Sequence, residues 1–264
     1  MSERLFLVDD RAHAAGPFAR MHATVVSSAD DMAEAFKQHG RGSVWIAPHA
    51  ACLGVLSAVL VGTPADRRLL LLERVSSARR ELLRARFRIL VEAGEGVRLL
   101  ANEELSEVIA SPQRRDLFIG GTVDRDDSAI VLFRGDLEPM VVPLAWFRPS
   151  GDGTRPDPDG FDVADSGQTV RLGAYEAATD AILYDFDAEY RRRARANALA
   201  EDESFGASVK RLRLQRGLGR GDFRGVNAKE VARIERGEVR EPHRKTLASL
   251  ANALGVDVDE LGTF

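Results

Sequence analysis

Apolar and polar positions follow three different patterns along the 264-residue chain, and each pattern predicts a different kind of fold. In the first region, short apolar runs alternate with stretches of helical periodicity, which is typical of parallel βαβ units. The expected strands lie at 4–8, 23–28, 43–48 and 68–73, and the expected helices at 30–40, 50–60 and 77–87. We therefore expect an α/β domain with a doubly wound parallel sheet at residues 1–115.

The pattern changes at Leu117 to an alternation of period two, which indicates half-buried antiparallel strands. The first two runs flank the turn-rich segment 124–128, as in a β-hairpin. Pro143 interrupts a later run, because proline cannot donate a hydrogen bond to a strand ladder. The expected strands lie at 117–123, 129–133, 140–147, 161–163 and 169–172. They predict a small antiparallel β unit at 116–173.

Helical periodicity dominates the rest of the chain. Ile182, Phe186 and Tyr190 follow one another at i, i+4 and i+8, which predicts a connecting helix at 174–203 with one buried face. Three further helices are expected at 204–217, 225–237 and from 242 onward. Residues 204–264 are therefore expected to form an all-α bundle.

Composition indicates a soluble protein of the reducing cytoplasm. The formal net charge is -4, and Cys52 is the single cysteine of the sequence, which excludes an internal disulfide framework. The longest apolar stretch, 50–62, is shorter than the roughly 20 residues that cross a bilayer. The first ten residues lack the long apolar region of a signal peptide. We expect no export and no association with a membrane.

Charge is unevenly distributed between the two ends of the chain. Residues 204–264 contain twelve Lys and Arg against eight Asp and Glu, so they carry +4 and the preceding 203 residues carry -8. A basic segment on an acidic body is expected when one module contacts phosphates. The charge pattern therefore favours a partner that carries phosphates, such as double-stranded DNA.

Three stretches in the basic segment give it a family resemblance. "VKRLRLQRGL", "GVNAKEVARIERG" and "PHRKTLASLANALGVDVDEL" follow in this order from Val209. Together they resemble the helix-turn-helix domain of the Xre/Cro type found in phage repressors. The resemblance implies that 227–236 is the recognition helix, which enters the major groove. It also implies that Arg213 pairs with Glu235.

One departure from the Xre/Cro pattern concerns the helix before the recognition helix. The family has a full helix between "RGL" and "GV", whereas this chain has only "GRGDFR" at 219–224, about three residues less. Phe223 is expected to occupy the core position of the missing apolar residue. The second helix should be stunted, which weakens the expectation of phosphate contacts from it.

The face of 227–236 opposite Val231 and Ile234 is expected to read bases, because long cationic side chains reach guanine O6 and N7. Lys229 and Arg233 are the principal candidates on this face. The four residues expected to contact bases are Ala228, Lys229, Ala232 and Arg233. The residues expected to contact phosphates are Asn227, Arg236, Arg240, His243, Arg244 and Lys245. A solvated charged helix face is the alternative.

The first region offers no catalytic constellation. Asp9 and Asp10 end the first expected strand and resemble the acidic pocket of a response-regulator receiver domain, which holds magnesium. The strand at 43–48 has no Asp at the position of the phosphoacceptor, so the alternatives are a degenerate receiver-like sensor or two capping residues. No glycine-rich phosphate loop follows a strand, and the histidines lack metal-ligand spacing. We expect no catalytic residue, no metal and no cofactor.

These observations favour a sequence-specific transcription regulator with an N-terminal sensing or dimerising region. We expect a homodimer, because repressors of this type bind paired half-sites. A small-molecule or protein effector is an open partner. The alternatives are an enzyme with an appended DNA-binding domain and a protein-interaction module whose helix-turn-helix has lost DNA binding.

Overall fold

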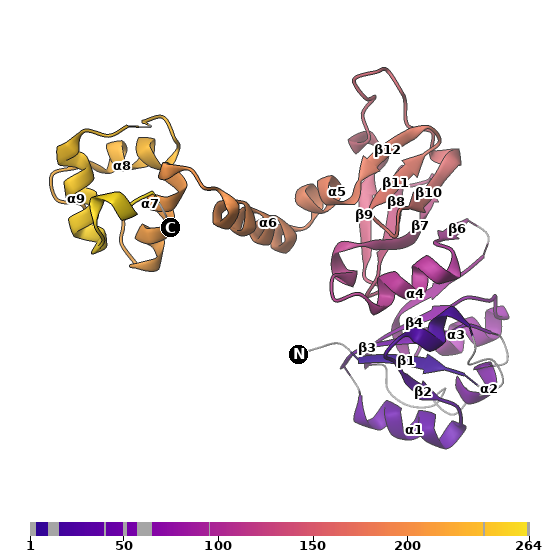
Figure 1. The fold of residues 1–264 in the computed structure, drawn as a ribbon. Coiled ribbons are helices and arrows are strands. Elements are labelled where there is room, and N and C mark those ends of the chain that lie inside the picture. Colours follow the sequence, from indigo (N-terminus) through magenta and orange to yellow (C-terminus); the bar gives the residue numbers. More distant parts are fainter. Residues whose placement is uncertain are drawn as a thin grey trace. The chain divides into compact units, whose positions relative to one another are not determined.

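The chain forms two compact units, Met1–Asp187 and Ala188–Phe264 (Figure 1). The computed structural model describes residues 4–9, 16–39, 41–49, 52–56, 65–94, 96–239 and 241–262. Within these ranges, none of the helices has the length and apolar character needed to cross a bilayer.

A five-stranded parallel sheet forms the first part of unit one, which confirms the predicted α/β region (Figure 1). Its strand order is β2-β1-β3-β4-β5. The strands are β1 (Arg4–Val8), β2 (Thr24–Val26), β3 (Arg41–Ala47), β4 (Ala65–Leu71) and β5 (Phe87–Glu92). The helices between them are the 3-10 helix Pro17–Arg20, α1 (Ala29–Gln38), α2 (Leu53–Leu56) and α3 (Ser77–Arg84). The sequence pattern did not predict the edge strand β5. The expected helix 77–87 instead includes Phe87, the first residue of this strand.

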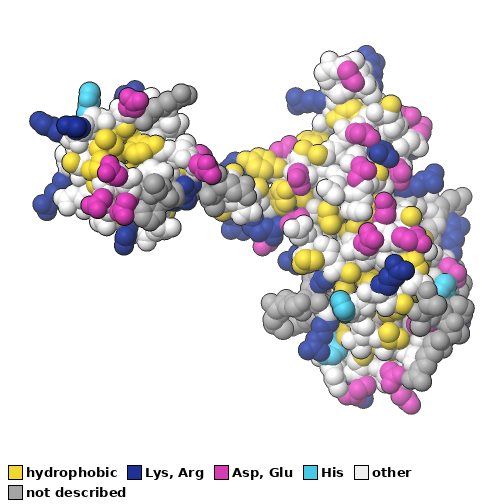
Figure 2. Space-filling view, viewed as in Figure 1, with side chains coloured by type: hydrophobic (Ala, Val, Ile, Leu, Met, Phe, Trp, Pro, Cys, Tyr) yellow, Lys and Arg dark blue, Asp and Glu magenta, His cyan; other side chains and the backbone are white. Residues whose placement is uncertain are grey.

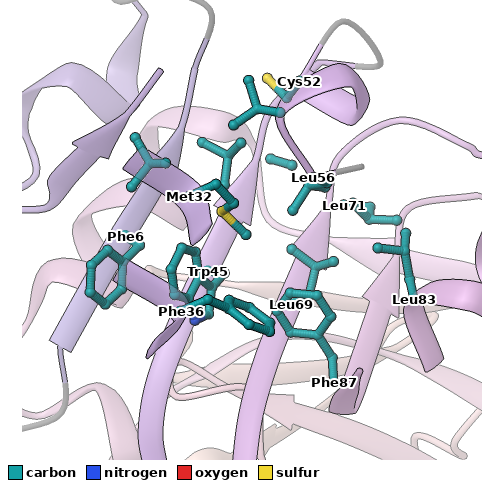
Figure 3. Packing of buried hydrophobic residues seen from close by; sticks show 14 of the residues in the cluster. Phe6, Met32, Phe36, Trp45, Cys52, Leu56, Leu69, Leu71, Leu83 and Phe87 are labelled. Carbon is teal, nitrogen blue, oxygen red and sulfur yellow. The ribbon is translucent and has the colours of Figure 1, made fainter. Parts of the chain in front are cut away.

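The core of this sheet lies where α1, α2 and α3 pack on it (Figure 3). Trp45 of β3 is fully buried and stacks on Phe6 of β1, with ring centroids 4.1 Å apart. Its indole Nε1 donates a hydrogen bond to Ser43 Oγ at 2.9 Å. Strand residues of the opposite face, such as Ile46 and Leu70, are buried as well. The sheet is therefore covered on both faces, as parallel sheets require.

Two antiparallel sheets follow, which confirms the predicted antiparallel middle of the fold, but strands at 97–99 and 175–178 lie outside the expected bounds 116–173. The four-stranded sheet has the order β6-β7-β8-β9, and the three-stranded sheet has the order β10-β11-β12. Their strands are β6 (Val97–Leu99), β7 (Phe118–Asp124), β8 (Ala129–Arg134), β9 (Pro139–Pro143), β10 (Phe161–Ala164), β11 (Thr169–Leu172) and β12 (Tyr175–Ala178). Helix α4 (Asn102–Ala110) connects β6 to β7. The expected strand 140–147 ends at Pro143, and Leu144–Trp146 forms a 3-10 turn.

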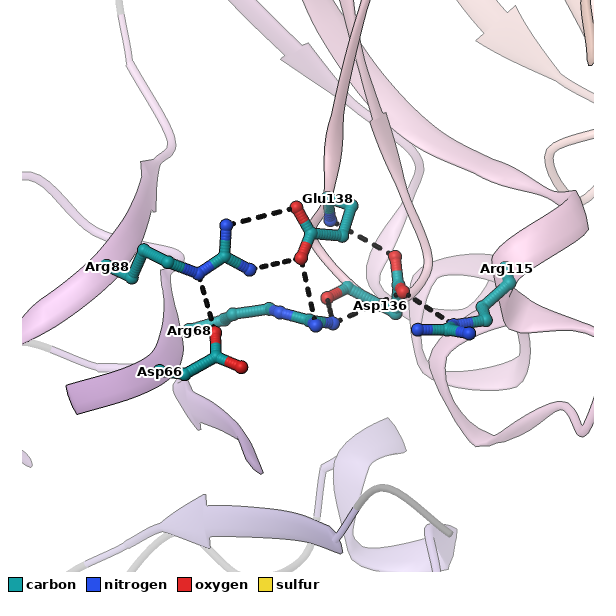
Figure 4. Close-up of polar contacts among 6 residues, drawn as sticks. All are labelled: Asp66, Arg68, Arg88, Arg115, Asp136 and Glu138. Atoms are coloured by element: carbon teal, nitrogen blue, oxygen red, sulfur yellow. Dashed lines mark hydrogen bonds and ion pairs between the residues drawn. The ribbon is translucent and has the colours of Figure 1, made fainter. Parts of the chain in front are cut away.

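A buried ion-pair network joins the parallel sheet to the antiparallel part of unit one (Figure 4). Arg68 of β4 places Nη1 3.2 Å from Asp136 Oδ2 and Nη2 2.9 Å from Glu138 Oε1. Arg115 adds a contact of 3.0 Å between its Nε and Asp136 Oδ2. The side chains of Arg68 and Asp136 are 5% and 1% exposed. Losing one partner would leave a buried charge unpaired, so the network holds the two parts together.

The predicted connecting helix at 174–203 is instead a strand and two helices. β12 is followed by α5 (Thr179–Phe186) and α6 (Ala188–Glu201). Asp187 separates the helices because its backbone is extended and its Oδ2 accepts from Arg134 Nη2 at 2.6 Å. The expected apolar face of one helix is wrong: Ile182 is buried, but Phe186 is 37% exposed.

Unit two contains α6, α7 (Phe205–Gln215), α8 (Ala228–Glu235), α9 (Arg244–Leu254) and the 3-10 turn Val258–Glu260. Helices α7, α8 and α9 enclose one apolar core, which confirms the predicted all-α segment. Val209 and Leu212 of α7, Val231 and Ile234 of α8, and Leu250 of α9 are fully buried in it, at 0–1% exposure. This core fixes which face of α8 remains in solvent.

Candidate nucleic-acid interface

Helix α8 begins and ends at residues that the sequence indicates. Asn227 is the N-cap, and its side chain accepts from the backbone N–H of Glu230 at 2.8 Å. The side chain of Glu230 accepts from Thr246 Oγ1 at 3.3 Å, which connects the start of α8 to α9. Gly237 follows the helix with φ +71°, a left-handed conformation that favours glycine.

The residues predicted to contact bases share the face of α8 that points away from the core. Ala228, Lys229 and Arg233 are exposed, and Ala232 is half-buried between them. Lys229 and Arg233 are four residues apart, so they lie one above the other on the helix surface. The small alanines beside them would allow close approach of a groove edge. The geometry therefore places two cations on one exposed helix surface, and a major groove admits an α-helix.

The residues predicted to contact phosphates lie around this surface. Asn227, Arg236, His243, Arg244 and Lys245 are all exposed. Arg240 lies outside the described residues. Arg244 and Lys245 open α9, where the unpaired N–H groups of a helix start also favour an anion. Figure 2 shows Lys and Arg side chains projecting from several points of the visible face of unit two.

Two of these arginines form ion pairs with an exposed carboxylate, Glu238, which the sequence pattern does not indicate. Glu238 accepts from Arg233 Nε at 3.2 Å and from Arg236 Nε at 2.6 Å. The hydrogen bond from Arg236 and the proximity of Arg233 keep the pKa of Glu238 below its ordinary value. Glu238 therefore stands where a DNA phosphate would compete for the same two guanidinium groups.

Arg213 and Glu235 form an ion pair between α7 and α8. Arg213 Nε lies 2.5 Å from Glu235 Oε1, and the two side chains are 9% and 1% exposed. Arg213 also donates from Nη1 to the carbonyl of Leu218 at 2.8 Å. Arg220, which the sequence pattern does not indicate, is a third member, and its Nε lies 2.8 Å from Glu235 Oε2. One buried carboxylate thus fixes α7, α8 and the segment between them.

Burial and two arginines act on the pKa of Glu235 in opposite directions. Burial alone would raise its pKa, but the hydrogen bonds and charges of Arg213 and Arg220 outweigh burial and lower the pKa below its ordinary value. The two arginine partners therefore favour the ionised form of Glu235.

The segment between α7 and α8 contains no helix in the part that the structure describes, residues 216–227. It consists of turns, in which Asp222 N–H donates to the Gly219 carbonyl at 3.3 Å and Gly219 N–H to Asp222 Oδ2 at 2.7 Å. Phe223 is 3% exposed and packs in the core as expected. The predicted stunted helix is thus a loop, because three missing residues remove nearly one helical turn.

Comparison with family models identifies the C-terminal segment of the chain. Residues 204–264 match the family model described as a helix-turn-helix domain, and no family model matches the rest of the chain. No curated protein and no solved structure matches the chain. The segment that carries the exposed face of α8 is therefore a helix-turn-helix domain, which indicates DNA binding.

Proposed function

We propose that this protein is a sequence-specific, DNA-binding transcription regulator of the Xre type, with α8 as its recognition helix. The observation that carries the proposal is the placement of Lys229 and Arg233 on the solvent face of α8, inside a helix-turn-helix domain. The buried Val231 and Ile234 hold the opposite face against α7 and α9. The two cations are therefore held on a rigid element, as base contacts require.

In this proposal Lys229 and Arg233 donate hydrogen bonds to guanine O6 and N7, while Ala228 and Ala232 contact base edges sterically. The phosphate contacts orient α8 on the duplex and carry no sequence information. They are made by Asn227, Arg236, Arg240, His243, Arg244 and Lys245. The short bond between Arg236 and Glu238 must open or shift when the protein binds.

The proposal includes a cytoplasmic homodimer, and unit one is proposed to sense an effector or to supply the dimer contacts. It includes no catalytic role.

The test is equilibrium binding of the full chain to duplex DNA, first to a random pool and then to the sequence selected from it. Phosphate contacts release counterions, so the logarithm of the binding constant should fall linearly with the logarithm of salt concentration. For about six contacts, the expected loss between 50 and 200 mM salt is roughly a thousandfold. Affinity that does not change with salt would contradict the proposal.

One observation favours a second candidate, a protein-interaction module. The described segment between α7 and α8 has no helix, so the domain lacks an element that normally crosses the DNA backbone. No binding of the full chain to any duplex at low salt would favour this candidate. Selection of one DNA sequence from the random pool would exclude it.

A further inference from the structure

The strand order of the parallel sheet marks a place where open α/β sheets bind ligands. From β1 the chain continues to β2 on one side, whereas β3, β4 and β5 follow on the other side (Figure 1). The carboxyl ends of β1 and β3 therefore border the topological switch point. Ligands of such sheets bind in the crevice outside the strands at this point.

A cavity of about 100 Å³ lies at this place. Asp9 directly follows β1, and His49 comes two residues after β3. Asn102, the first residue of α4, forms part of the rim. Leu7 and Phe18 contribute apolar walls. The cavity has room for a ligand of a few non-hydrogen atoms.

Asp9 is the unusual group in this cavity. The residue is 2% exposed, and its Oδ1 has no hydrogen-bond partner among the residues that the structure describes. Its backbone N–H donates to the Val26 carbonyl at 3.0 Å, which fixes the main chain next to β2. The other titratable group of the lining, His49, faces Glu73, with 3.7 Å between Nδ1 and Oε1. A buried carboxylate oxygen without a donor is costly, so a ligand that donates to it would recover that cost.

We propose that this cavity binds a small ligand with a primary ammonium group, which donates to the carboxylate of Asp9. The ammonium group supplies the charge and the N–H donors that the carboxylate lacks, and the apolar walls suit a short carbon chain. Among the described residues, no three His, Cys, Asp or Glu side chains are grouped as metal ligands, so a metal ion fits less well. The proposal does not depend on DNA binding.

The test is thermal unfolding of the full chain, monitored by tryptophan fluorescence. Both tryptophans of the sequence, Trp45 and Trp146, lie in unit one, so the signal reports the unit that holds the cavity. Ethylammonium chloride is the probe, and tetramethylammonium chloride and sodium chloride at equal ionic strength are references without an N–H donor. Ethylammonium should raise the Tm by about 3–5 °C at ten times its Kd, and the references should not.

Asp9→Asn keeps the side chain's size and removes its charge. This variant should melt at the wild-type temperature or higher without a ligand, and it should lose the response to ethylammonium. Asp126→Asn, the same change at an exposed turn, should respond like the wild type. Asn102→Phe narrows the rim without changing Asp9 and should also lose the response.

Three results would overturn the assignment. They are an equal response of the wild type to all three salts, an unchanged response in Asp9→Asn or Asn102→Phe, and stabilisation of the wild type by magnesium chloride but not by ethylammonium.

Discussion

At the residue scale, the two proposed base-reading side chains of α8 differ from the cations around them in what their loss should change. A base contact distinguishes one sequence from another, whereas a phosphate contact strengthens binding to every sequence. Lys229→Ala and Arg233→Ala should each weaken binding to the selected site by about 1–3 kcal/mol and binding to random duplex much less. Fluorescence anisotropy of the full chain on both DNAs measures the difference.

A matched control for these variants is Lys37→Ala, which removes an exposed cation from α1. It should bind both DNAs like the wild type. Equal losses of Lys229→Ala on the selected and random duplexes would make Lys229 a phosphate contact.

Replacing Glu238 should strengthen DNA binding, whereas replacing Lys229 or Arg233 should weaken it. Its carboxylate holds Arg233 and Arg236, so it competes with phosphate for both guanidinium groups. Glu238→Gln should raise the affinity for random duplex by about two- to fivefold, a small factor because the pairs are exposed. Glu241→Gln removes the same charge three residues further on, so it measures the effect of net charge alone. The idea fails if the two variants gain equally.

At the element scale, α8 owes its position to Glu235. Its carboxylate is bonded by Arg213 from α7 and by Arg220 from the following loop. Glu235→Ala should leave two guanidinium groups without their partner and cost about 3–5 kcal/mol of unfolding free energy. Glu235→Ala should therefore lower the melting temperature of unit two, as measured by circular dichroism at 222 nm. Lys229→Ala should leave this melting temperature nearly unchanged. Similar melting of both variants would show that the pair is not structural.

The lowered pKa of Glu235 adds a pH dependence with a definite sign. A carboxylate whose folded pKa lies below its unfolded value of about 4.3 contributes full stability above that value. This contribution is lost as the pH falls through the lower folded pKa. The Tm difference between the wild type and Glu235→Gln should therefore be constant near pH 7 and shrink below pH 4. A difference that grows in acid would contradict the direction of the shift.

The same elements show what sequence patterns can and cannot predict. The N-cap of α8 at Asn227 and the burial of Val231 in α8 both depend on local sequence, and both can be predicted from it. Strand β5 was missed because its burial does not alternate regularly, so its short apolar run carried no clear period. The break at Asp187 depends on Arg134, which lies 53 residues away. Arg220 and Glu238 were missed because turns, which have no periodicity, bring them to their partners.

At the scale of the whole molecule, the tertiary contacts divide the chain into two compact units, whereas the sequence pattern predicts more regions than that. The change of pattern near residue 116 falls inside the antiparallel part, because the parallel sheet ends with β5 at Glu92 and the antiparallel strand β6 already begins at Val97. The two regions nevertheless form one compact unit, because the pairs of Arg68 with Asp136 and Glu138 join them. Charged residues far apart in sequence made this connection, and a hydropathy pattern contains no information about such pairs.

The dimensions of unit two lead to the prediction of a dimer. Helix α8 has eight residues and is about 12 Å long, so it can face only a few base pairs. Two base-reading side chains at about 1–3 kcal/mol each cannot distinguish one site from the very many competing sites of a genome. A second copy doubles the number of base contacts, and its half-site should lie about one DNA turn away. Sedimentation equilibrium should therefore show two chains on each selected duplex, and the selected sequence should contain a repeat at that spacing. A monomer both free and on DNA, with a selected site that lacks the repeat, would contradict the prediction.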